Sequence, residues 1–493
     1  MSHDIVVIGA GGAGMCAALA ARESGARVLV LERAPQDKRG GNTAFASGTF
    51  RMVHHGADDI RKAVPDLTEQ ELAMTDFGEY TAEQYFDDLG RITQYNTEPE
   101  LADVLVHHSA DTVNWLHGLG VRFLPNYGRQ AYKVDGRFKF FGGSVIYANG
   151  GGAGLMESHY GNAERLGIDV LYNARGIALL RQGHRIVGVR AEVDGVPRDI
   201  PARAVVLASG GFEANREWRA RYLGPGWDMA KVRGSRYNTG DGIRMALEAG
   251  AQPYGQWSGC HSCAWERNAG DFGSVETRHN GYRHSYVYGI VVNAEGRRFI
   301  DEGADFRNFT YAKYGRVILQ QPGGFAWQVF DAQSKPLLRD EYKLRGATKV
   351  SADTLENLVI RMQDVDRDAF LETVREYNAA ITRDVPFNPN VKDGRRTHGL
   401  AVDKTNWATA LEQPPYEAYS VGCGVTFTFG GVKIDTTGRV LDIDDAPLPG
   451  LYAAGEMVGG IFYFNYPGAT GLMSSAVFGR LAGQSAAGYV HDA

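Results

Sequence analysis

Cysteine is scarce in this chain, with four residues among 493. That is too few to build a disulfide framework for a protein of this size. Cys260 and Cys263 have CxxC spacing, but no second cysteine pair or suitably spaced histidine pair completes a zinc site. We therefore expect no metal centre. We interpret Cys260 and Cys263 as reduced thiols packed near a site, with redox or metal chemistry as the alternative.

Long apolar runs and a strong excess of one charge are also missing. No stretch approaches the ~20 apolar residues that cross a bilayer, so we expect no direct membrane insertion. The net charge of −6 gives no reason to expect nucleic acid as a partner. The first apolar strand starts at residue 4, which leaves no room for a secretory signal peptide, so we expect a cytoplasmic protein.

Glycine is abundant, with 63 residues, and it marks turns. The most informative turn is Gly9-x-Gly11-x-x-Gly14, which follows an apolar strand and opens a helix of small residues. Gly9 allows the tight turn, Gly11 lets the backbone approach a pyrophosphate, and Gly14 lets helix and strand pack closely. The helix N-terminus supplies N–H groups for phosphates, and Glu32 after the second strand can accept ribose hydroxyls. The segment predicts dinucleotide binding, with an ordinary βαβ turn as the alternative.

The same strand–turn–helix pattern runs through residues 1–256 and returns at 426–493. Residues 257–425 contain more aromatic and charged residues, with two helices expected near 352–363 and 366–382. We predict an α/β fold in which a Rossmann-like dinucleotide-binding domain, mainly parallel sheet with helices, is split in sequence by an inserted α+β capping domain. Such an arrangement places a ligand cleft at the domain boundary.

Within the first domain, the apolar periodicity predicts one amphipathic helix over residues 98–119. Residues 175–189 are expected to form a hairpin that turns at 182–184. A final helix is expected to begin near Gly471.

Three later features favour FAD over NAD. The strand that ends at Ser209 and Gly210 resembles the second nucleotide-contacting strand of two-strand flavin folds. The segment 451–456 resembles their late motif, in which the acid, here Glu456, meets the ribitol chain. The helix near Gly471 offers an N-terminus that can stabilise negative charge on a reduced flavin. No second GxGxxG and no CxxxxC motif is present, which argues against an NAD(P)H-using disulfide reductase.

With these elements in order, the chain resembles the fumarate reductase/succinate dehydrogenase flavoprotein superfamily over essentially its full length. The matching segments include 40–48, 238–242, 297–302 and 450–456. Covalent members carry a flavin-linking histidine where this chain has Asn42, so the resemblance implies FAD held non-covalently. The predicted cofactor-binding residues are Gly9, Gly11, Gly14, Glu32, Arg33, Gly41, Asn42, Thr43, Ser47, Gly48, Gly176, Ser209, Gly210, Asp241, Gly455, Glu456, Gly471, Leu472 and Ser474.

Within the superfamily, the chain is most similar to tricarballylate dehydrogenases. The similarity lies in the segments 302–314, 391–397 and 465–475. It implies oxidation of a small polycarboxylate, tricarballylate, to cis-aconitate, with hydride passing to FAD. It also implies that a separate electron-acceptor protein reoxidises the flavin.

Removing two hydrogens across a CH–CH bond beside a carboxylate requires a hydride acceptor, a positioned proton acceptor and cationic donors. The resemblance places His261 at a substrate-carboxylate position and Arg307 at that of a proton-transferring arginine, with one inserted residue in the alignment. Tyr311, one helical turn on, is a second candidate for orienting the substrate or relaying the proton. The alternatives are a structural role for His261 and a salt bridge from Arg307 to Asp305 or Glu302.

The chain departs from the fumarate reductase pattern at the substrate. The late clamping arginine of that enzyme falls near Tyr466, and its second clamping histidine falls near Phe427. Arg283 and His284 can supply cations for a three-carboxylate substrate, although each alone is more typical of an exposed surface charge. We predict Arg283, His284, Tyr466 and Gly468 as further substrate-binding residues.

Other functions remain open at this point. The segment 466–469 also resembles 3-ketosteroid Δ1-dehydrogenases, whose tyrosine polarises a ketone. The alternative is therefore a flavin dehydrogenase or reductase for another substrate, either a fumarate-type dicarboxylate or a 3-ketosteroid-type ketone. A flavin-containing binding or scaffold protein is a third interpretation.

Overall fold

The computed structural model describes residues 3–277 and 281–492. It divides into two compact units. The first unit comprises Met1–Pro225, Gly234–Cys260 and Phe427–Ala493, and the second comprises Gly226–Arg233 and His261–Thr426. The predicted first domain includes the short segment Gly226–Arg233, which the structure groups with the second unit. It belongs with the second unit because its strand pairs with the long strand of that unit.

A mainly parallel sheet forms the centre of the first unit, with strand order β22-β23-β13-β1-β2-β9. Its central strands are runs of Val, Ile, Leu and Ala that are buried along their whole length, as expected for a parallel sheet covered on both faces. Only β22 pairs antiparallel, at the edge. The predicted α/β architecture is therefore confirmed. The strands are β1 (Ile5–Ile8), β2 (Val28–Leu31), β9 (Asp169–Leu171), β13 (Ala204–Leu207), β22 (Arg439–Leu441) and β23 (Pro447–Ala453).

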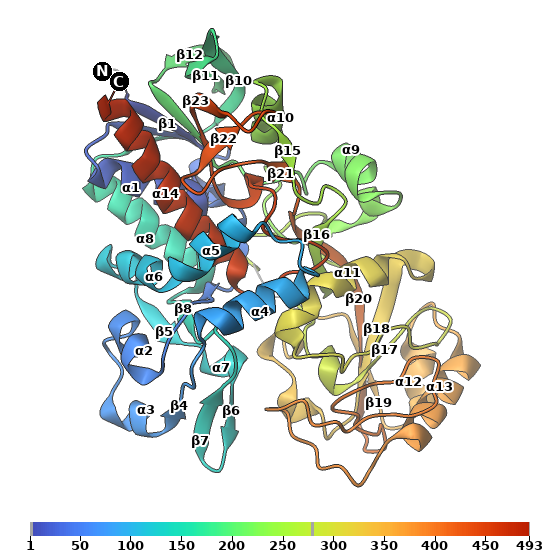
Figure 1. Ribbon diagram of the computed structural model, residues 1–493. Coiled ribbons are helices and arrows are strands. Elements are labelled where there is room, and N and C mark those ends of the chain that lie inside the picture. Colours follow the sequence, from blue (N-terminus) through green and yellow to red (C-terminus); the bar gives the residue numbers. More distant parts are fainter. Residues whose placement is uncertain (1–2, 278–280, 493) are drawn as a thin grey trace. The chain divides into compact units, whose positions relative to one another are not determined.

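Helices α1 (Gly12–Glu23) and α14 (Thr470–Asp492) pack directly against each other beside this sheet (Figure 1). The contact is close because α14 presents Gly483 to the α1 backbone, where a Cβ atom would collide with the carbonyl oxygen of Ala17. Helix α8 (Gly151–Arg165) lies beside α1. The predicted final helix is confirmed, and it begins at Thr470.

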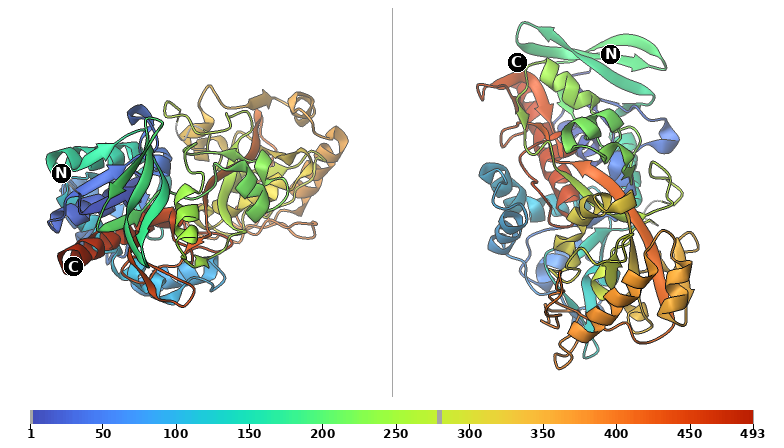
Figure 2. Two further views of the ribbon diagram at one scale, coloured as in Figure 1. Left: turned by 90° about the horizontal axis from the view of Figure 1, so that it is seen from above. Right: turned by 90° about the vertical axis from the view of Figure 1, so that its right-hand side faces the viewer.

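A separate antiparallel sheet extends from one end of the first unit (Figure 2). It consists of β10 (Ala174–Gln182), β11 (Arg185–Val193) and β12 (Val196–Pro201). The first two strands are the predicted hairpin, which is confirmed. The third strand extends it.

The predicted single helix over 98–119 is wrong, since the structure contains two helices, α5 (Pro99–His107) and α6 (Ser109–Gly118). Ser109 explains the break. Its hydroxyl donates to the carbonyl of Val106 at 2.7 Å and accepts the N–H of Val53 at 3.1 Å. Ser and Thr side chains of this kind compete with the helix for backbone groups.

The rest of the first unit consists of shorter elements. They are α2 (Ala57–Ala63), α3 (Glu69–Ala73), α4 (Ala82–Ile92), α7 (Tyr127–Gln130), α9 (Arg216–Trp218), α10 (Asp241–Glu248), β3 (Thr49–Phe50), β4 (Thr75–Asp76), β5 (Phe123–Pro125), β6 (Ala131–Val134), β7 (Arg137–Phe140), β8 (Ile146–Ala148), β15 (Pro253–Tyr254) and β21 (Gly431–Val432).

The second unit is built on a mixed sheet in which the long strand β20 (Tyr416–Thr428) pairs with four other strands. Helices α12 (Leu355–Arg361) and α13 (Arg367–Ala380) bury Leu358 and Phe370 against Trp327 of this sheet. None of the helices in residues 3–277 and 281–492 has the length and hydropathy of a membrane-spanning segment. The remaining elements are β14 (Lys231–Val232), β16 (Cys260–Glu266), β17 (Ile290–Val292), β18 (Phe325–Phe330), β19 (Lys349–Ala352), β20 (Tyr416–Thr428) and α11 (Tyr311–Leu319).

Candidate active site

A cavity opens in the first unit, where β1, β2 and β13 end. The glycine turn after β1 forms part of its wall. Gly9 has a φ of +101°, and a Cβ atom there would collide with the carbonyl of Ala208. Gly14 packs against the backbone of Gly9 in the same way. At Gly11, by contrast, the nearest atom to an added Cβ lies 3.8 Å away, so the backbone is open to a ligand.

Glu32 lies in the wall of this cavity, where β2 ends. Its carboxylate accepts the N–H of Ala10 at 2.9 Å and the N–H of Ala34 at 2.8 Å. Burial raises the pKa of Glu32, and these N–H groups act in the opposite direction. The carboxyl group is therefore fixed by the two turns that frame the cavity.

A charged group formed by Arg33, Arg175 and Asp241 lines another part of the cavity. Arg33 lies 2.8 Å and Arg175 lies 2.6 Å from the carboxylate of Asp241. Burial alone would raise the pKa of Asp241, but the hydrogen bond and charge of Arg175, together with the charge of Arg33, hold it below its usual value. Arg175 was not predicted as a site residue.

Two acidic residues meet at Asn42. Its amide nitrogen donates to Glu213 at 2.7 Å and to Glu456 at 3.3 Å, while its amide oxygen accepts the N–H of Ser235 at 2.9 Å. Glu456 also accepts the N–H of Thr428 at 2.9 Å. Glu213, which was not predicted, is completely buried, and burial together with the charge of Glu456 raises its pKa well above the usual range.

The structure brings many of the predicted cofactor-binding residues together around this cavity. Missed lining residues include Gly12, Ala13, Arg175, Ser235 and Tyr237. The predicted residues that line the cavity are Gly9, Gly11, Glu32, Arg33, Gly41, Asn42, Thr43, Gly176, Ser209, Gly210, Asp241 and Glu456.

Some predicted residues lie outside the cavity lining. Gly48 and Gly455 serve close chain packing, because an added Cβ would lie 2.7 Å from Gly151 or 2.6 Å from Ala13. On α14, Ser475 rather than Ser474 reaches the lining. The predicted residues that do not line the cavity are Gly14, Ser47, Gly48, Gly455, Gly471, Leu472 and Ser474.

In the second unit, four aromatic side chains form a compact group that we call the His–Tyr cluster: His261, Tyr282, His284 and Tyr311. The ring of Tyr311, the first residue of α11, lies 5.0 Å from that of His261 on β16 and 4.7 Å from that of His284. Tyr282 stacks on His284 at 5.1 Å. The structure therefore brings His261, His284 and Tyr311 into contact with one another. The sequence predicted each of them as a site residue on separate grounds.

Both histidines of this cluster are buried. Burial lowers the pKa of His261 and of His284 well below the usual value, and the positive charge of Arg233 lowers both further. The charge of Arg307 also acts on His284. Both imidazoles are consequently neutral near pH 7, so they can donate or accept hydrogen bonds without adding charge.

Arg307 occupies a 3-10 turn (Arg307–Phe309) directly before α11 and is half-buried. Glu302 anchors the segment that leads to this turn. Its carboxylate lies 2.5 Å from Arg298 and accepts the N–H of Val291 at 2.7 Å. Glu302 is thus the partner of Arg298 in the 297–302 motif.

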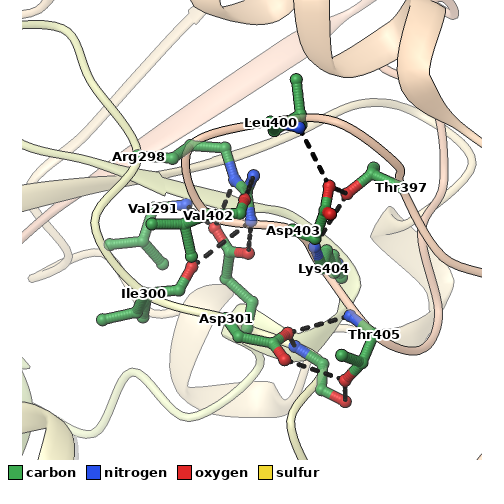
Figure 3. Close-up of polar contacts among 12 residues, drawn as sticks. Val291, Arg298, Ile300, Asp301, Thr397, Leu400, Val402, Asp403, Lys404 and Thr405 are labelled. Atoms are coloured by element: carbon green, nitrogen blue, oxygen red, sulfur yellow. Dashed lines mark hydrogen bonds and ion pairs between the residues drawn. The ribbon is translucent and has the colours of Figure 1, made fainter.

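Asp301 anchors the same segment to the loop around residue 405 (Figure 3). Its carboxylate accepts the N–H of Thr405 at 3.0 Å and the hydroxyl of Thr405 at 2.8 Å. It also accepts the N–H of Gly303 at 2.9 Å. These bonds fix the backbone that precedes Arg307.

Arg283 is buried, with 1% of its surface exposed, and pairs with Glu266 at 2.8 Å. This corrects the expectation that Arg283 is typical of a surface charge. His284 is buried as well. Ion pairing inside the unit explains why a charged side chain is tolerated at position 283.

Tyr466 and Gly468 lie in the first unit. The ring of Tyr466 packs 5.3 Å from Phe427, and its hydroxyl oxygen accepts the N–H of Ala469 at 3.0 Å. The carbonyl of Gly468 accepts a hydrogen bond from Arg51 at 2.9 Å. The resemblance places the late clamping arginine of fumarate reductases near Tyr466. In this chain, aromatic side chains occupy that region instead.

Cys260 and Cys263 are buried, as are Cys16 and Cys423, and the four cysteines form no disulfide. Within residues 3–277 and 281–492, no group of three or more His, Cys, Asp or Glu side chains is arranged to hold a metal ion. The thiol of Cys263 instead lies 3.1 Å from a guanidinium nitrogen of Arg233. Arg233 was not predicted, because a single arginine outside any motif carries no sequence signal.

Comparison with known proteins agrees with this geometry. A family model described as an FAD binding domain matches residues 4–472. The fumarate reductase (cytochrome) of Shewanella frigidimarina is 32% identical over 493 residues, which cover 99% of this chain and 77% of the relative. A solved structure, the open conformation of a flavocytochrome c3 fumarate reductase, has 28% identity and a TM-score of 0.73, covering 99% of this chain and 78% of that chain.

A 3-ketosteroid delta1-dehydrogenase from Sterolibacterium denitrificans shares the fold, with a TM-score of 0.76, 21% identity and 99% coverage of both chains. Together with the glycine turn and the cavity, these findings define the class of this protein as an FAD-binding flavoprotein. The chain belongs to the FAD-binding-domain family that includes the fumarate reductases. The predictions of an FAD cofactor and of an FAD-dependent oxidoreductase acting on CH–CH bonds are confirmed.

The first unit fits this cofactor. Gly11 leaves its backbone open at the N-terminus of α1, where helix N–H groups would stabilise a pyrophosphate. Glu32 and Glu456 line the same cavity and would offer carboxyl oxygens to hydroxyl groups. The residues of this cavity therefore suit an anionic and hydroxyl-rich ligand.

Proposed function

We propose that this protein is a dehydrogenase that removes two hydrogens from a CH–CH bond of a small polycarboxylate, converting tricarballylate to cis-aconitate. The observation that supports this most is the packing of two neutral histidines and Tyr311 beside arginine charges in the second unit. Hydrogen-bond donors and guanidinium groups are the partners that carboxylates prefer. The segments 302–314, 391–397 and 465–475 narrow the substrate to tricarballylate by resemblance.

The first unit would hold the cofactor without a covalent bond. Backbone N–H groups at Gly11 and the start of α1 would bind the pyrophosphate, Glu32 the adenosine ribose and Glu456 the ribitol. Asn42 offers no nucleophilic nitrogen for a flavin link, and its amide is engaged by Glu213 and Ser235. When bound, FAD accepts one hydrogen of the substrate as a hydride.

The second unit would bind the substrate and take the proton. His261 and His284 donate hydrogen bonds to carboxylates, which stabilises the negative charge that develops beside the breaking C–H bond. The second hydrogen leaves as a proton to Arg307, and the carbon–carbon double bond forms between the two carbons. Arginine is protonated near neutral pH, so Arg307 accepts this proton only as one of its own passes along a relay to water. In that relay the hydroxyl of Tyr311 would release its proton as it receives one.

A second candidate is supported by the aromatic residues of the first unit. Tyr466 packs 5.3 Å from Phe427 and 5.4 Å from Phe462. An apolar wall of this kind suits a larger keto compound, such as the substrate of a 3-ketosteroid dehydrogenase. A fumarate-type dicarboxylate is a further option. The neutral histidines and the arginine charges favour the polycarboxylate.

The reduced cofactor must be reoxidised for turnover. We propose that a separate electron-acceptor protein does this in the cytoplasm, as the resemblance to tricarballylate dehydrogenases implies.

An anaerobic substrate screen tests the proposal. The purified holoenzyme is mixed with tricarballylate, succinate, a 3-ketosteroid and a neutral triester of tricarballylate, and the visible band of oxidised flavin is followed. We expect tricarballylate alone to bleach it, with cis-aconitate as the product. Bleaching by a ketosteroid, but not by tricarballylate, would establish the second candidate instead.

A further inference from the structure

Arg233 lies at the end of β14 and is almost fully buried within the second unit. Its backbone N–H donates to the carbonyl of Val425 at 2.9 Å, which continues the pairing of β14 with β20. Its side chain is 9% exposed. The backbone pairing fixes where this guanidinium enters the unit.

The hydrogen-bond partners of this guanidinium are both neutral. One nitrogen donates to the thiol sulfur of Cys263 at 3.1 Å, and another donates to the hydroxyl of Tyr282 at 2.8 Å. The charge also lies 4.2 Å from the centre of the Tyr282 ring. Burial raises the pKa of the Cys263 thiol, so this group does not neutralise the arginine as a thiolate.

Arg233 forms no ion pair with an aspartate or glutamate in the part of the chain that the structure describes. A buried charge without a counter-ion is strongly unfavourable unless something else compensates it. Three other buried arginines have a carboxylate partner, with Arg51 paired to Asp88, Arg283 to Glu266 and Arg298 to Glu302.

The surroundings of Arg233 suit an anion. Its charge acts on both His261 and His284, so it lies next to the His–Tyr cluster. Both imidazoles are neutral and bring hydrogen-bonding capacity without a competing charge. The guanidinium has more N–H donors than its two bonds use, and a planar donor fork matches a carboxylate.

We propose that Arg233 is a substrate-binding residue whose guanidinium pairs with one carboxylate of the substrate beside the His–Tyr cluster. This rests on the proposed function, since it identifies the buried positive charge that selects a polycarboxylate over a ketone. The late clamping arginine of fumarate reductase is missing from this chain, where its position falls near Tyr466. Arg233 would supply a positive charge for the polycarboxylate in its place.

Malonate is a suitable probe because it carries two carboxylates but no CH–CH bond to oxidise. Its affinity for the holoenzyme is measured by calorimetry and by the change in the flavin spectrum. Arg233→Gln should weaken malonate binding on the order of 100-fold, the loss expected for a charge-assisted bidentate contact. Arg233→Lys, which keeps the charge but not the planar fork, should weaken it roughly tenfold.

Arg375→Gln is the matched control, because it makes the same substitution at an exposed arginine of α13 in the same unit. It should bind malonate within about threefold of the wild type. Unchanged malonate affinity in a folded Arg233→Gln protein with full flavin content would overturn the inference. Should the glutamine variant not fold, Arg233→Lys decides by the same measure, since unchanged affinity there also overturns it.

The same experiment separates this inference from the proposed function. If tricarballylate is not oxidised but malonate binding still depends on Arg233, the carboxylate site stands and the assigned substrate is wrong. If tricarballylate is oxidised and neither its KM nor malonate affinity responds to Arg233→Gln, the role of Arg233 is wrong and the reaction stands.

Discussion

The side-chain amide of Asn42 donates a hydrogen bond of 2.7 Å to the buried carboxyl group of Glu213. The same nitrogen lies 3.3 Å from the carboxylate of Glu456. Two acidic residues thus approach one donor in a buried place, where two negative charges would repel each other. A proton retained on Glu213 relieves this repulsion, in agreement with its raised pKa.

This arrangement makes the stability of the protein depend on pH. Folded Glu213 keeps its proton above the ordinary carboxyl pKa of 4.5, where the unfolded chain has lost it. The folded state then binds more protons, so its free energy of unfolding falls by up to about 1.4 kcal/mol per pH unit as the pH rises. Glu213→Gln, a neutral mimic, should reduce this fall in thermal unfolding between about pH 5 and 8.

Glu164→Gln is a suitable control, because Glu164 is exposed on α8 and should leave the pH slope unchanged. A Glu213→Gln protein with the wild-type slope would show that Glu213 is ionised in the folded state.

The flavin should be released on denaturation. Asn42 lies where a linking histidine would be needed, and an amide nitrogen does not form such a link. Acid precipitation should therefore leave all of the FAD in solution, and the mass of the denatured chain should equal that of the sequence. A mass increase equal to one flavin would contradict the non-covalent assignment.

Glu32→Ala should weaken retention of FAD. The substitution removes an acceptor for the N–H groups of Ala10 and Ala34 and the proposed ribose contact. We expect FAD affinity to fall at least tenfold, since unpaired buried N–H groups and a lost hydrogen bond together amount to about 1–3 kcal/mol. The measurement is flavin occupancy after dialysis. Wild-type occupancy would remove Glu32 from the ribose site.

The nucleotide half of the site could be predicted because its requirements are local. The spacing of Gly9, Gly11 and Gly14 reflects backbone approaches within one turn and the helix after it, and Glu32 ends the very next strand. Such short-range constraints leave a clear pattern in the sequence. The parallel strands are equally readable as continuous apolar runs.

The missed residues depend on contacts between distant segments. Glu213 matters because Asn42 and Glu456 converge on it, and Arg233 matters because β14 pairs with β20. Neither a glutamate after a glycine turn nor a single arginine carries a local signal. The broken helix near Ser109 has the same origin, since Val53 supplies the competing hydrogen bond.

Glu302→Ala should strongly destabilise the second unit. It would leave the guanidinium of Arg298 buried without its carboxylate and the N–H of Val291 without its acceptor. Breaking a buried pair of this kind typically lowers the free energy of unfolding by about 3–5 kcal/mol. Glu372→Ala breaks the exposed pair with Arg297 and should lower it by no more than about 1 kcal/mol. Equal effects of the two substitutions in denaturant unfolding would contradict this account.

Arg307→Lys should abolish most turnover while leaving the flavin in place. Asp301 and Glu302 hold the backbone before Arg307, so the lysine variant should fold normally, and position 307 lies in the second unit rather than in the cofactor cavity. A lysine ammonium cannot reproduce the planar fork or share its proton in the same geometry, so kcat should fall roughly 10²–10⁴-fold.

The control Arg297→Lys alters an exposed side chain and should keep the wild-type rate. Stopped-flow reduction of the flavin by tricarballylate measures both, and a wild-type rate for Arg307→Lys would assign the proton transfer to another group, with Tyr311 the next residue to test.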